Sequence, residues 1–133
     1  MTDPHTDPGN LSWGRCVITS CGKFNADLGG HIVLWDLGLV VRFPPGSTII
    51  LPSALLTHSN VKIQPGEERF SLTQYTAGGL LRWVYNGFVS DKSLLARLRR
   101  EGGAAEYAKW EGDRKARFEE GLQSFGMFDD LLS

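Results

Sequence analysis

The sequence predicts a mainly β fold, in which a double-stranded β-helix (jelly-roll) core is followed by a helical C-terminal extension. Two observations support this prediction. Up to about residue 88, β-branched and aromatic residues are frequent, and Gly and Pro interrupt them at short intervals. This pattern is typical of short antiparallel strands joined by turns. From about residue 91 the chain is rich in Lys, Arg, Glu and Ala, which favour helices. We therefore expect a β core over residues 1–88 and a helical extension over 89–133.

Six apolar or alternating runs are the expected strands, and turn-forming residues bound each of them. They are residues 11–20, 31–37, 39–43, 48–51, 55–63 and 69–75. The Pro-Pro-Gly sequence at 44–46 is a strong stop, because proline donates no ladder hydrogen bond and glycine permits a positive φ. A polar turn is expected at 22–27 and another at 64–67. A hairpin at 64–67 would place residues 69–71 beside the strand that carries His58.

Beyond residue 76 the pattern changes. Residues 77–79 form a hinge-like break, and a compact apolar segment follows at 80–84. Leu94, Leu95 and Leu98 recur at helical spacing, and Gly102-Gly103 separates two expected helices. Residues 91–120 contain eight Lys/Arg and seven Asp/Glu. This mixed charge predicts a solvated helix pair that covers one face of the core, with a basic DNA-binding arm as the less favoured alternative.

Composition and charge exclude some functional classes. Hydrophobic residues make up 41% and charged residues 22% of the chain, as in ordinary globular proteins. The formal net charge of −1 provides no overall basic field for nucleic acid or for a membrane. The first residues lack the pattern of a signal peptide, and no apolar run is long enough to span a bilayer. Cys16 and Cys21 are expected to be structural thiols in a reducing, intracellular compartment. No stable protein partner is predicted.

His5 and Asp7 are the first residues that suggest chemistry. Residues i and i+2 of an extended segment project from the same face, so both side chains can reach one metal ion. His58, in a strand-like run, can complete the set. Two imidazoles and one carboxylate on one face of Fe(II) leave three positions free for a chelating co-substrate and O2. We therefore predict that His5, Asp7 and His58 are catalytic metal ligands.

A rival metal pair, His31 and Asp36, is rejected because a spacing of five places the two side chains on opposite faces of a strand. His31 is instead expected at a strand entry, and Asp36 as an outward-facing charge or a turn cap.

Arg69 is the expected anchor for the co-substrate. Its planar guanidinium can bind a carboxylate through two hydrogen bonds, and it stays charged when buried. Ser71 lies two residues further on the same strand face and can donate its hydroxyl to that carboxylate. Asn10, Trp13 and Tyr75 are candidates for the substrate pocket, although strand aromatics usually belong to the core.

The order of these motifs resembles the 2-oxoglutarate/Fe(II)-dependent dioxygenase superfamily over residues 5 to about 75. The matching segments are His5-Thr6-Asp7, Gly29-Gly30-His31-Ile32-Val33-Leu34, Pro45-Gly46-Ser47-Thr48-Ile49-Ile50-Leu51-Pro52-Ser53, His58 and Pro65-Gly66-Glu67-Glu68-Arg69-Phe70-Ser71. A longer string, from residues 29–36 through 74–80 to 83–88, is similar to a fungal, transposon-linked TET/JBP-like branch of this superfamily. Members of the superfamily carry a substantial segment ahead of their His-x-Asp motif. Here that motif begins at residue 5, so an N-terminally incomplete core is expected.

The resemblance implies a dioxygenase that hydroxylates a C–H bond while it decarboxylates 2-oxoglutarate to succinate. Its implied requirements are Fe(II), 2-oxoglutarate and O2. The TET/JBP-like branch further implies a methylated base in DNA, of the 5-methylcytosine type, as substrate, and therefore a nuclear location. Two alternatives stay open. One is a protein or small-molecule hydroxylase of the same superfamily, located in the cytoplasm. The other is an inactive truncated remnant or a non-catalytic β-module, which the short N-terminus favours.

Overall fold

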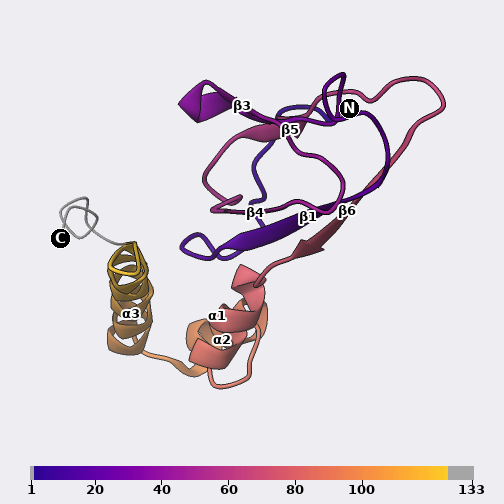
Figure 1. Cartoon of the computed structure of the whole chain (residues 1–133). Helices are drawn as coiled ribbons and strands as arrows, with labels where there is room; N and C mark the ends of the chain where they lie inside the picture. Colours follow the sequence, from indigo (N-terminus) through magenta and orange to yellow (C-terminus); the bar gives the residue numbers. More distant parts are fainter. Residues whose placement is uncertain (1, 126–133) are drawn as a thin grey trace. The chain divides into compact units, whose positions relative to one another are not determined.

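A computed structural model describes residues 2–125 of the chain (Figure 1). The chain divides into two compact units, Met1–Ala77 and Gly78–Ser133. Within residues 2–125, the first unit holds two three-stranded antiparallel sheets and the second holds three helices. The fold is therefore mixed α and β rather than mainly β. The sequence-based boundary after residue 88 differs from this division by helix α1 (Gly78–Tyr85), which belongs to the second unit.

One sheet of the β unit has the strand order β4-β1-β6. Its strands are β4 (Thr48–Leu51), β1 (Cys16–Lys23) and β6 (Glu68–Gln74). The central strand β1 pairs antiparallel with both neighbours. Along β1 the inward positions alternate with partly exposed ones, so one face of the sheet is buried, as strand geometry requires.

The other sheet has the order β3-β2-β5 and is built from three-residue strands. These are β3 (Leu39–Val41), β2 (Ile32–Leu34) and β5 (His58–Asn60). The strand expected over 31–37 ends early, because residues 35–37 form a short 3-10 helix. Gly38 closes that helix with a left-handed φ of 61°, which glycine adopts without steric cost. Asp36 accepts a hydrogen bond from the Thr57 backbone N–H at 2.5 Å.

Four other strands differ from the predicted bounds. Strand β3 ends at Val41 rather than at residue 43, and β6 is displaced by one residue at each end. Strand β1 begins at Cys16 rather than at residue 11, because Leu11 pairs with Thr76 and a turn closes at Gly14. It also runs two residues into the expected polar turn. Gly22 permits this extension: its φ is +119°, and a Cβ there would lie 2.2 Å from the Glu68 carbonyl oxygen. The strand expected over 55–63 is reduced to β5, since residues 52–56 form a tight turn after Pro52.

The turn at residues 64–67 is present, but it does not form the predicted hairpin. Gly66 has a φ of +83°, and the Glu67 N–H donates to the Gln64 carbonyl at 3.2 Å. However, β5 pairs with β2 and β6 pairs with β1. The segment between His58 and Arg69 therefore crosses from one sheet to the other. The prediction that these residues occupy adjoining strands was wrong, and the two side chains come from different sheets.

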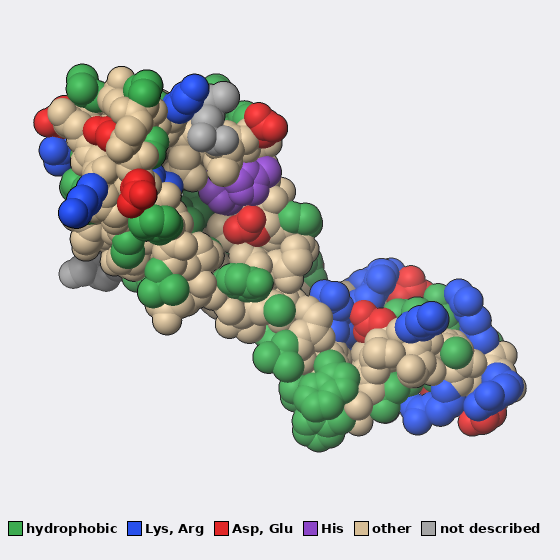
Figure 2. Space-filling model, turned by 90° about the vertical axis from the view of Figure 1, so that its right-hand side faces the viewer, with side chains coloured by type: hydrophobic (Ala, Val, Ile, Leu, Met, Phe, Trp, Pro, Cys, Tyr) green, Lys and Arg blue, Asp and Glu red, His purple; other side chains and the backbone are tan. Residues whose placement is uncertain are grey.

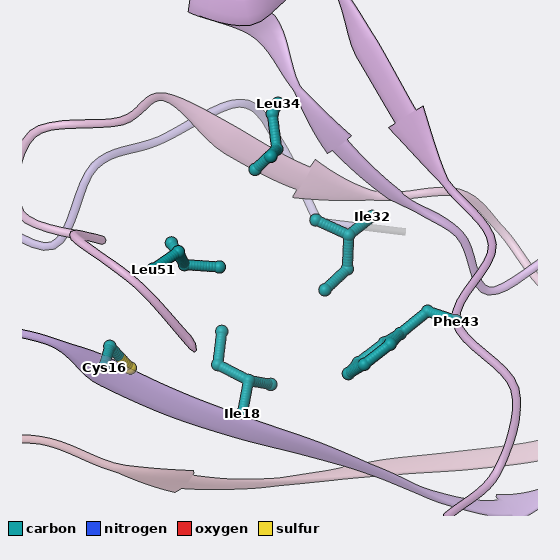
Figure 3. Close-up of a cluster of buried hydrophobic side chains, with 6 residues drawn as sticks. All are labelled: Cys16, Ile18, Ile32, Leu34, Phe43 and Leu51. Carbon is teal, nitrogen blue, oxygen red and sulfur yellow. The ribbon is translucent and has the colours of Figure 1, made fainter. Parts of the chain in front are cut away.

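Six buried apolar side chains form the core of the β unit, five from the two sheets and one from the loop after β3 (Figure 3). In Figure 3 they point toward one another between the ribbons. They are Cys16, Ile18, Ile32, Leu34, Phe43 and Leu51. Phe43 is the largest fully buried side chain, and it follows β3 directly before the Pro-Pro-Gly stop. Packing between the inner faces of two sheets is the usual way in which such strands bury their apolar residues.

The two thiols of the chain should differ sharply in reactivity. Cys16 is 2% exposed, and burial raises the pKa of its thiol, whereas Cys21 is exposed. Because the thiolate is the reactive form, we expect iodoacetamide to label only Cys21 in the folded protein. Mass spectrometry should show a second label only after denaturant is added. Equal labelling rates for both cysteines in the native state would contradict the core described here.

The second unit contains α1 (Gly78–Tyr85), α2 (Asp91–Glu101) and α3 (Ala104–Leu122). The two helices expected on either side of Gly102-Gly103 are confirmed as α2 and α3, while the apolar segment after the glycine break forms the additional helix α1. Ser90 caps α2 by accepting a hydrogen bond from the Ser93 N–H, a common helix start. Within residues 2–125, no helix is both long enough and apolar enough to cross a bilayer.

Candidate metal centre

A short backbone pairing brings His5 and His58 together. The N-terminal segment adds to the free edge of β5, where the His5 N–H donates to the His58 carbonyl at 3.1 Å and the His58 N–H donates to the His5 carbonyl at 2.9 Å. Directly opposed residues of an antiparallel pair project to the same face. The two imidazole rings accordingly lie 4.5 Å apart between centroids, and Figure 2 shows histidine side chains gathered on one face of the β unit.

Asp7 joins the two histidines from the same extended segment. Its backbone N–H donates to the Ser53 carbonyl at 2.9 Å, which holds the segment against the loop after β4. One carboxylate oxygen lies 3.8 Å from His5 Nε2, and the other lies 3.9 Å from His58 Nε2. One ligand atom from each of the three residues lies within 4.8 Å of the others. This group therefore offers two nitrogens and one carboxylate to a single ion.

The hydrogen bonds of the rings determine which nitrogens are free. His5 Nδ1 lies 2.7 Å from the Asp3 carbonyl oxygen, and His58 Nδ1 lies 2.9 Å from the Leu56 carbonyl oxygen. A carbonyl can only accept, so in both neutral rings Nδ1 carries the proton and Nε2 keeps its lone pair. Both Nε2 atoms lie near the Asp7 carboxylate. A backbone carbonyl on the other ring nitrogen is the usual support for a metal-binding histidine.

Asn10 and Ser53 support the carboxylate. The Asn10 side-chain amide donates to Asp7 at 3.3 Å and to the Ser53 hydroxyl at 3.0 Å. Ser53 is 1% exposed, so the hydrogen bond from Asn10 to Ser53 ties the Asn10 side chain to a residue of the protein interior. The chain thus orients Asp7 through its backbone and through a neighbouring amide, as is common for carboxylates that bind metals.

Arg69 lines the same cavity as the His-Asp-His group, from the opposite sheet. The cavity measures about 360 Å³, and its lining includes His5, Asp7, His58, Arg69 and Ser71. The Arg69 Nη1 donates to the Ser71 hydroxyl at 3.1 Å. Both residues project from one face of β6, as their spacing of two requires. The cavity is large enough for a small organic acid.

The guanidinium of Arg69 is partly withdrawn from water and carries no carboxylate partner among the described residues. Its Nε and Nη2 atoms are buried without a hydrogen-bond partner. The guanidinium carbon lies 5.9 Å from the ring centre of Phe24 and 5.8 Å from that of Phe43. Burial lowers the pKa of Arg69, yet an arginine stays protonated in proteins. A buried cation with free donors is costly unless an anion completes it.

The other predicted residues lie elsewhere. Trp13 and Tyr75 do not line this cavity, and Tyr75 is 58% exposed. Asn10 contacts the cavity only through Asp7. His31 stands at the entry to β2, outside the His-Asp-His group, and Asp36 caps the turn at Thr57.

Sequence reasoning missed several residues of the cavity wall. They are Thr2, Ile18, Ile32, Asn60 and Thr73. Thr73 could have been predicted from the sequence, because it follows Arg69 and Ser71 at the same spacing of two along β6. The two phenylalanines beside Arg69 lie in loops of the structure, although Phe43 had been expected at the end of a strand. Nothing in the sequence indicated that their rings would lie beside Arg69.

The fold and this group together have the features of a non-haem metal site. The His5–Asp7–His58 group resembles the 2-His-1-carboxylate facial triad. Among solved structures, the chain is similar in fold to NgTET1, which was solved in complex with 5mC DNA. The TM-score is 0.51 at 20% sequence identity, and the match covers 56% of this chain but only 27% of that chain. The chain thus resembles part of a TET fold. No protein-family model matches it, and no curated protein does.

Proposed function

We propose that this chain forms the iron- and 2-oxoglutarate-binding part of a double-stranded β-helix dioxygenase that hydroxylates a methylated base in DNA, of the 5-methylcytosine type. The observation that carries the proposal is the partly buried Arg69 guanidinium, which has no counterion among the described residues and shares a cavity with the His-Asp-His group. A dicarboxylate with one chelating end needs a metal ion for that end and a cation for its far carboxylate, and these two groups would provide both.

The donor set fits Fe(II). His5, Asp7 and His58 would hold the ion through two neutral nitrogens and one carboxylate, a set that suits non-haem iron. When bound, Fe(II) with 2-oxoglutarate and O2 supplies the oxidising power for C–H hydroxylation, with release of succinate and CO2. The net charge of the ion, the Asp7 carboxylate and the Arg69 guanidinium is +2, which the two negative charges of 2-oxoglutarate neutralise. This charge balance favours the dianion over a monoacid.

The chain's own residues position the co-substrate. Arg69 binds the distal carboxylate through its free N–H donors, and Ser71 adds a hydroxyl on the same side. Phe24 and Phe43 flank the guanidinium and exclude water from this end, which strengthens the ion pair.

The choice of DNA as substrate is supported by the complex in which NgTET1 was solved, with 5mC DNA. A base in a duplex must leave the stack before it can enter a cavity.

The test is an incubation of the full chain with Fe(II), 2-oxoglutarate, O2 and a duplex that contains 5-methylcytosine. Mass spectrometry of the nucleosides should show an oxidised base, and succinate should form in step with it. The unmethylated duplex is the control. Succinate formation that only peptides or metabolites stimulate would favour the other hydroxylase class, and absence of turnover would favour a non-catalytic module.

Replacing Arg69 with alanine should raise the KM for 2-oxoglutarate by about 10- to 100-fold, because a charge-assisted hydrogen-bonded pair contributes roughly 1.5–3 kcal/mol. Steady-state succinate formation measures the change. Arg42→Ala is the matched control, since Arg42 is exposed and pairs with Asp27 on the surface at 2.6 Å. An unchanged KM in Arg69→Ala would remove Arg69 from the co-substrate site.

A further inference from the structure

The helical unit has a second cavity, distinct in composition from the metal cavity. It measures about 350 Å³ and lies among α1, α2 and α3. Its lining residues are Arg82, Asp91, Leu95, Trp110, Arg114 and Arg117. The lining therefore contains three guanidinium groups but only one carboxylate. Figure 2 shows Lys and Arg side chains over much of the visible face of this unit.

The single carboxylate in the lining is already engaged. One Asp91 oxygen accepts from Arg82 Nε at 3.0 Å, and the other accepts from the Asn86 side-chain amide at 2.6 Å. The first contact links α1 to the start of α2, and the second links the turn after α1 to the same residue, so Asp91 joins these segments. The charge of Arg82 is balanced by this pair, whereas the charges of the other two arginines are not.

Arg114 and Arg117 are held by aromatic rings rather than by acids. The Arg114 guanidinium lies 5.6 Å from the Trp110 ring centre, and that of Arg117 lies 5.0 Å from the Tyr85 ring centre. Stacking uses the face of a guanidinium and leaves its N–H donors at the edge available. Among residues 2–125, neither arginine has a hydrogen bond or an ion pair.

Trp110 adds one more donor without a partner. Its indole Nε1 is buried and makes no hydrogen bond within the described residues, although a buried indole N–H normally finds an acceptor. Among the described side chains, the lining therefore offers several donors and two arginines without an ion-pair partner, while its one carboxylate is already engaged. An occupant that satisfies it must be an anion that accepts several hydrogen bonds.

We propose that this cavity binds a backbone phosphate of a DNA strand. A phosphodiester supplies the oxygen acceptors and the negative charge that the lining lacks, and arginine forks recognise phosphate through paired hydrogen bonds. The cavity selects a phosphate ester, while the choice of DNA as its source rests on the proposed function. The formal net charge of the chain is only −1, so DNA contact requires such a local site rather than a general basic field.

Fluorescence anisotropy of a labelled oligonucleotide with the full chain, without iron or 2-oxoglutarate, tests the proposal. The double variant Arg114→Gln/Arg117→Gln should bind at least about tenfold more weakly, and the slope of log affinity against log salt should fall by about 1 for each lost phosphate contact. The matched control is Arg97→Gln/Arg99→Gln, which removes the same charge from exposed positions of α2 outside the cavity. Circular dichroism should show the same helix content in both variants.

Several results would overturn the proposal. These are equal losses of affinity in the two double variants, no DNA binding by the unaltered chain, or binding of inorganic phosphate without binding of DNA. The anisotropy assay contains neither iron nor 2-oxoglutarate, so it tests this proposal separately from the oxygenase proposal. Failure of base oxidation with intact, cavity-dependent DNA binding would then count against the oxygenase proposal alone.

Discussion

Substitution of His58 by alanine is expected to lower Fe(II) affinity by at least about 100-fold and to abolish 2-oxoglutarate turnover. The loss of one supporting residue around a metal already costs roughly 10- to 100-fold, and removal of a ligand should cost more. His58 is 6% exposed, and its Nδ1 faces a carbonyl, so its Nε2 is held in one orientation beside Asp7. Anaerobic Fe(II) titration and a succinate assay measure the two effects.

The third histidine of the chain provides the control. His31 lies in the same unit but outside the His-Asp-His group, so His31→Ala should keep both Fe(II) affinity and turnover. His58→Gln, which is closer in volume, separates loss of the ligand from loss of packing. Unchanged Fe(II) binding in a folded His58→Ala protein would show that the histidine pair has another role.

Replacement of Phe43 by alanine should destabilise the β unit by about 3–5 kcal/mol, the range found when a buried phenylalanine is truncated. Phe43 is 2% exposed and fills the space between the sheets. Small domains have only about 5–15 kcal/mol of total stability, so the substitution removes a large share of it. The extent of Cys16 alkylation, measured at increasing urea concentrations, reports on the unfolding of this unit specifically, because Cys16 lies in the same core.

Phe70 is the matched control for this experiment. It is 60% exposed on β6, so Phe70→Ala should change stability by less than about 1 kcal/mol. If the two variants unfold at the same urea concentration, Phe43 does not occupy the core described here.

Local patterns allowed much of the β unit to be predicted. Strand β4 has the predicted bounds, and β6 differs from its prediction by one residue at each end. The Pro-Pro-Gly stop and the turn at 64–67 are present because proline and glycine act through their own backbone restrictions. The short strands β2 and β5 were predicted too long, because a 3-10 helix at residues 35–37 follows β2 and the turn at residues 52–56 precedes β5.

The sequence indicated that His5, Asp7 and His58 would lie together, as they do, but it did not indicate how the chain brings them together. The spacing of His5 and Asp7 indicated a shared face, which the extended segment has. That His5 pairs with His58 across two backbone hydrogen bonds could not be read from the sequence, because the partners are far apart along the chain. The hairpin proposed for Arg69 was wrong for the same reason. Local sequence indicates a turn, whereas the pairing of β6 with β1 depends on which apolar faces pack together.

The helical unit shows a similar limit. Helical spacing predicted α2 and α3, but α1 begins with two glycines, which are poor helix formers. The charge count suggested only a solvated surface of mixed sign. The grouping of Arg114 and Arg117 on aromatic rings appears only when α1 and α3 are placed together.

The central claim is that this chain holds iron and 2-oxoglutarate together. Its most direct test is an anaerobic titration of the full chain with Fe(II) in the presence of 2-oxoglutarate, in which visible absorption is the measured signal. If His5, Asp7 and His58 hold the iron and Arg69 holds the far carboxylate, a charge-transfer band should grow and saturate at one iron per chain. The band should be lost in His58→Ala and should require more 2-oxoglutarate in Arg69→Ala. Absence of the band, or a band that His58→Ala leaves unchanged, would contradict the account.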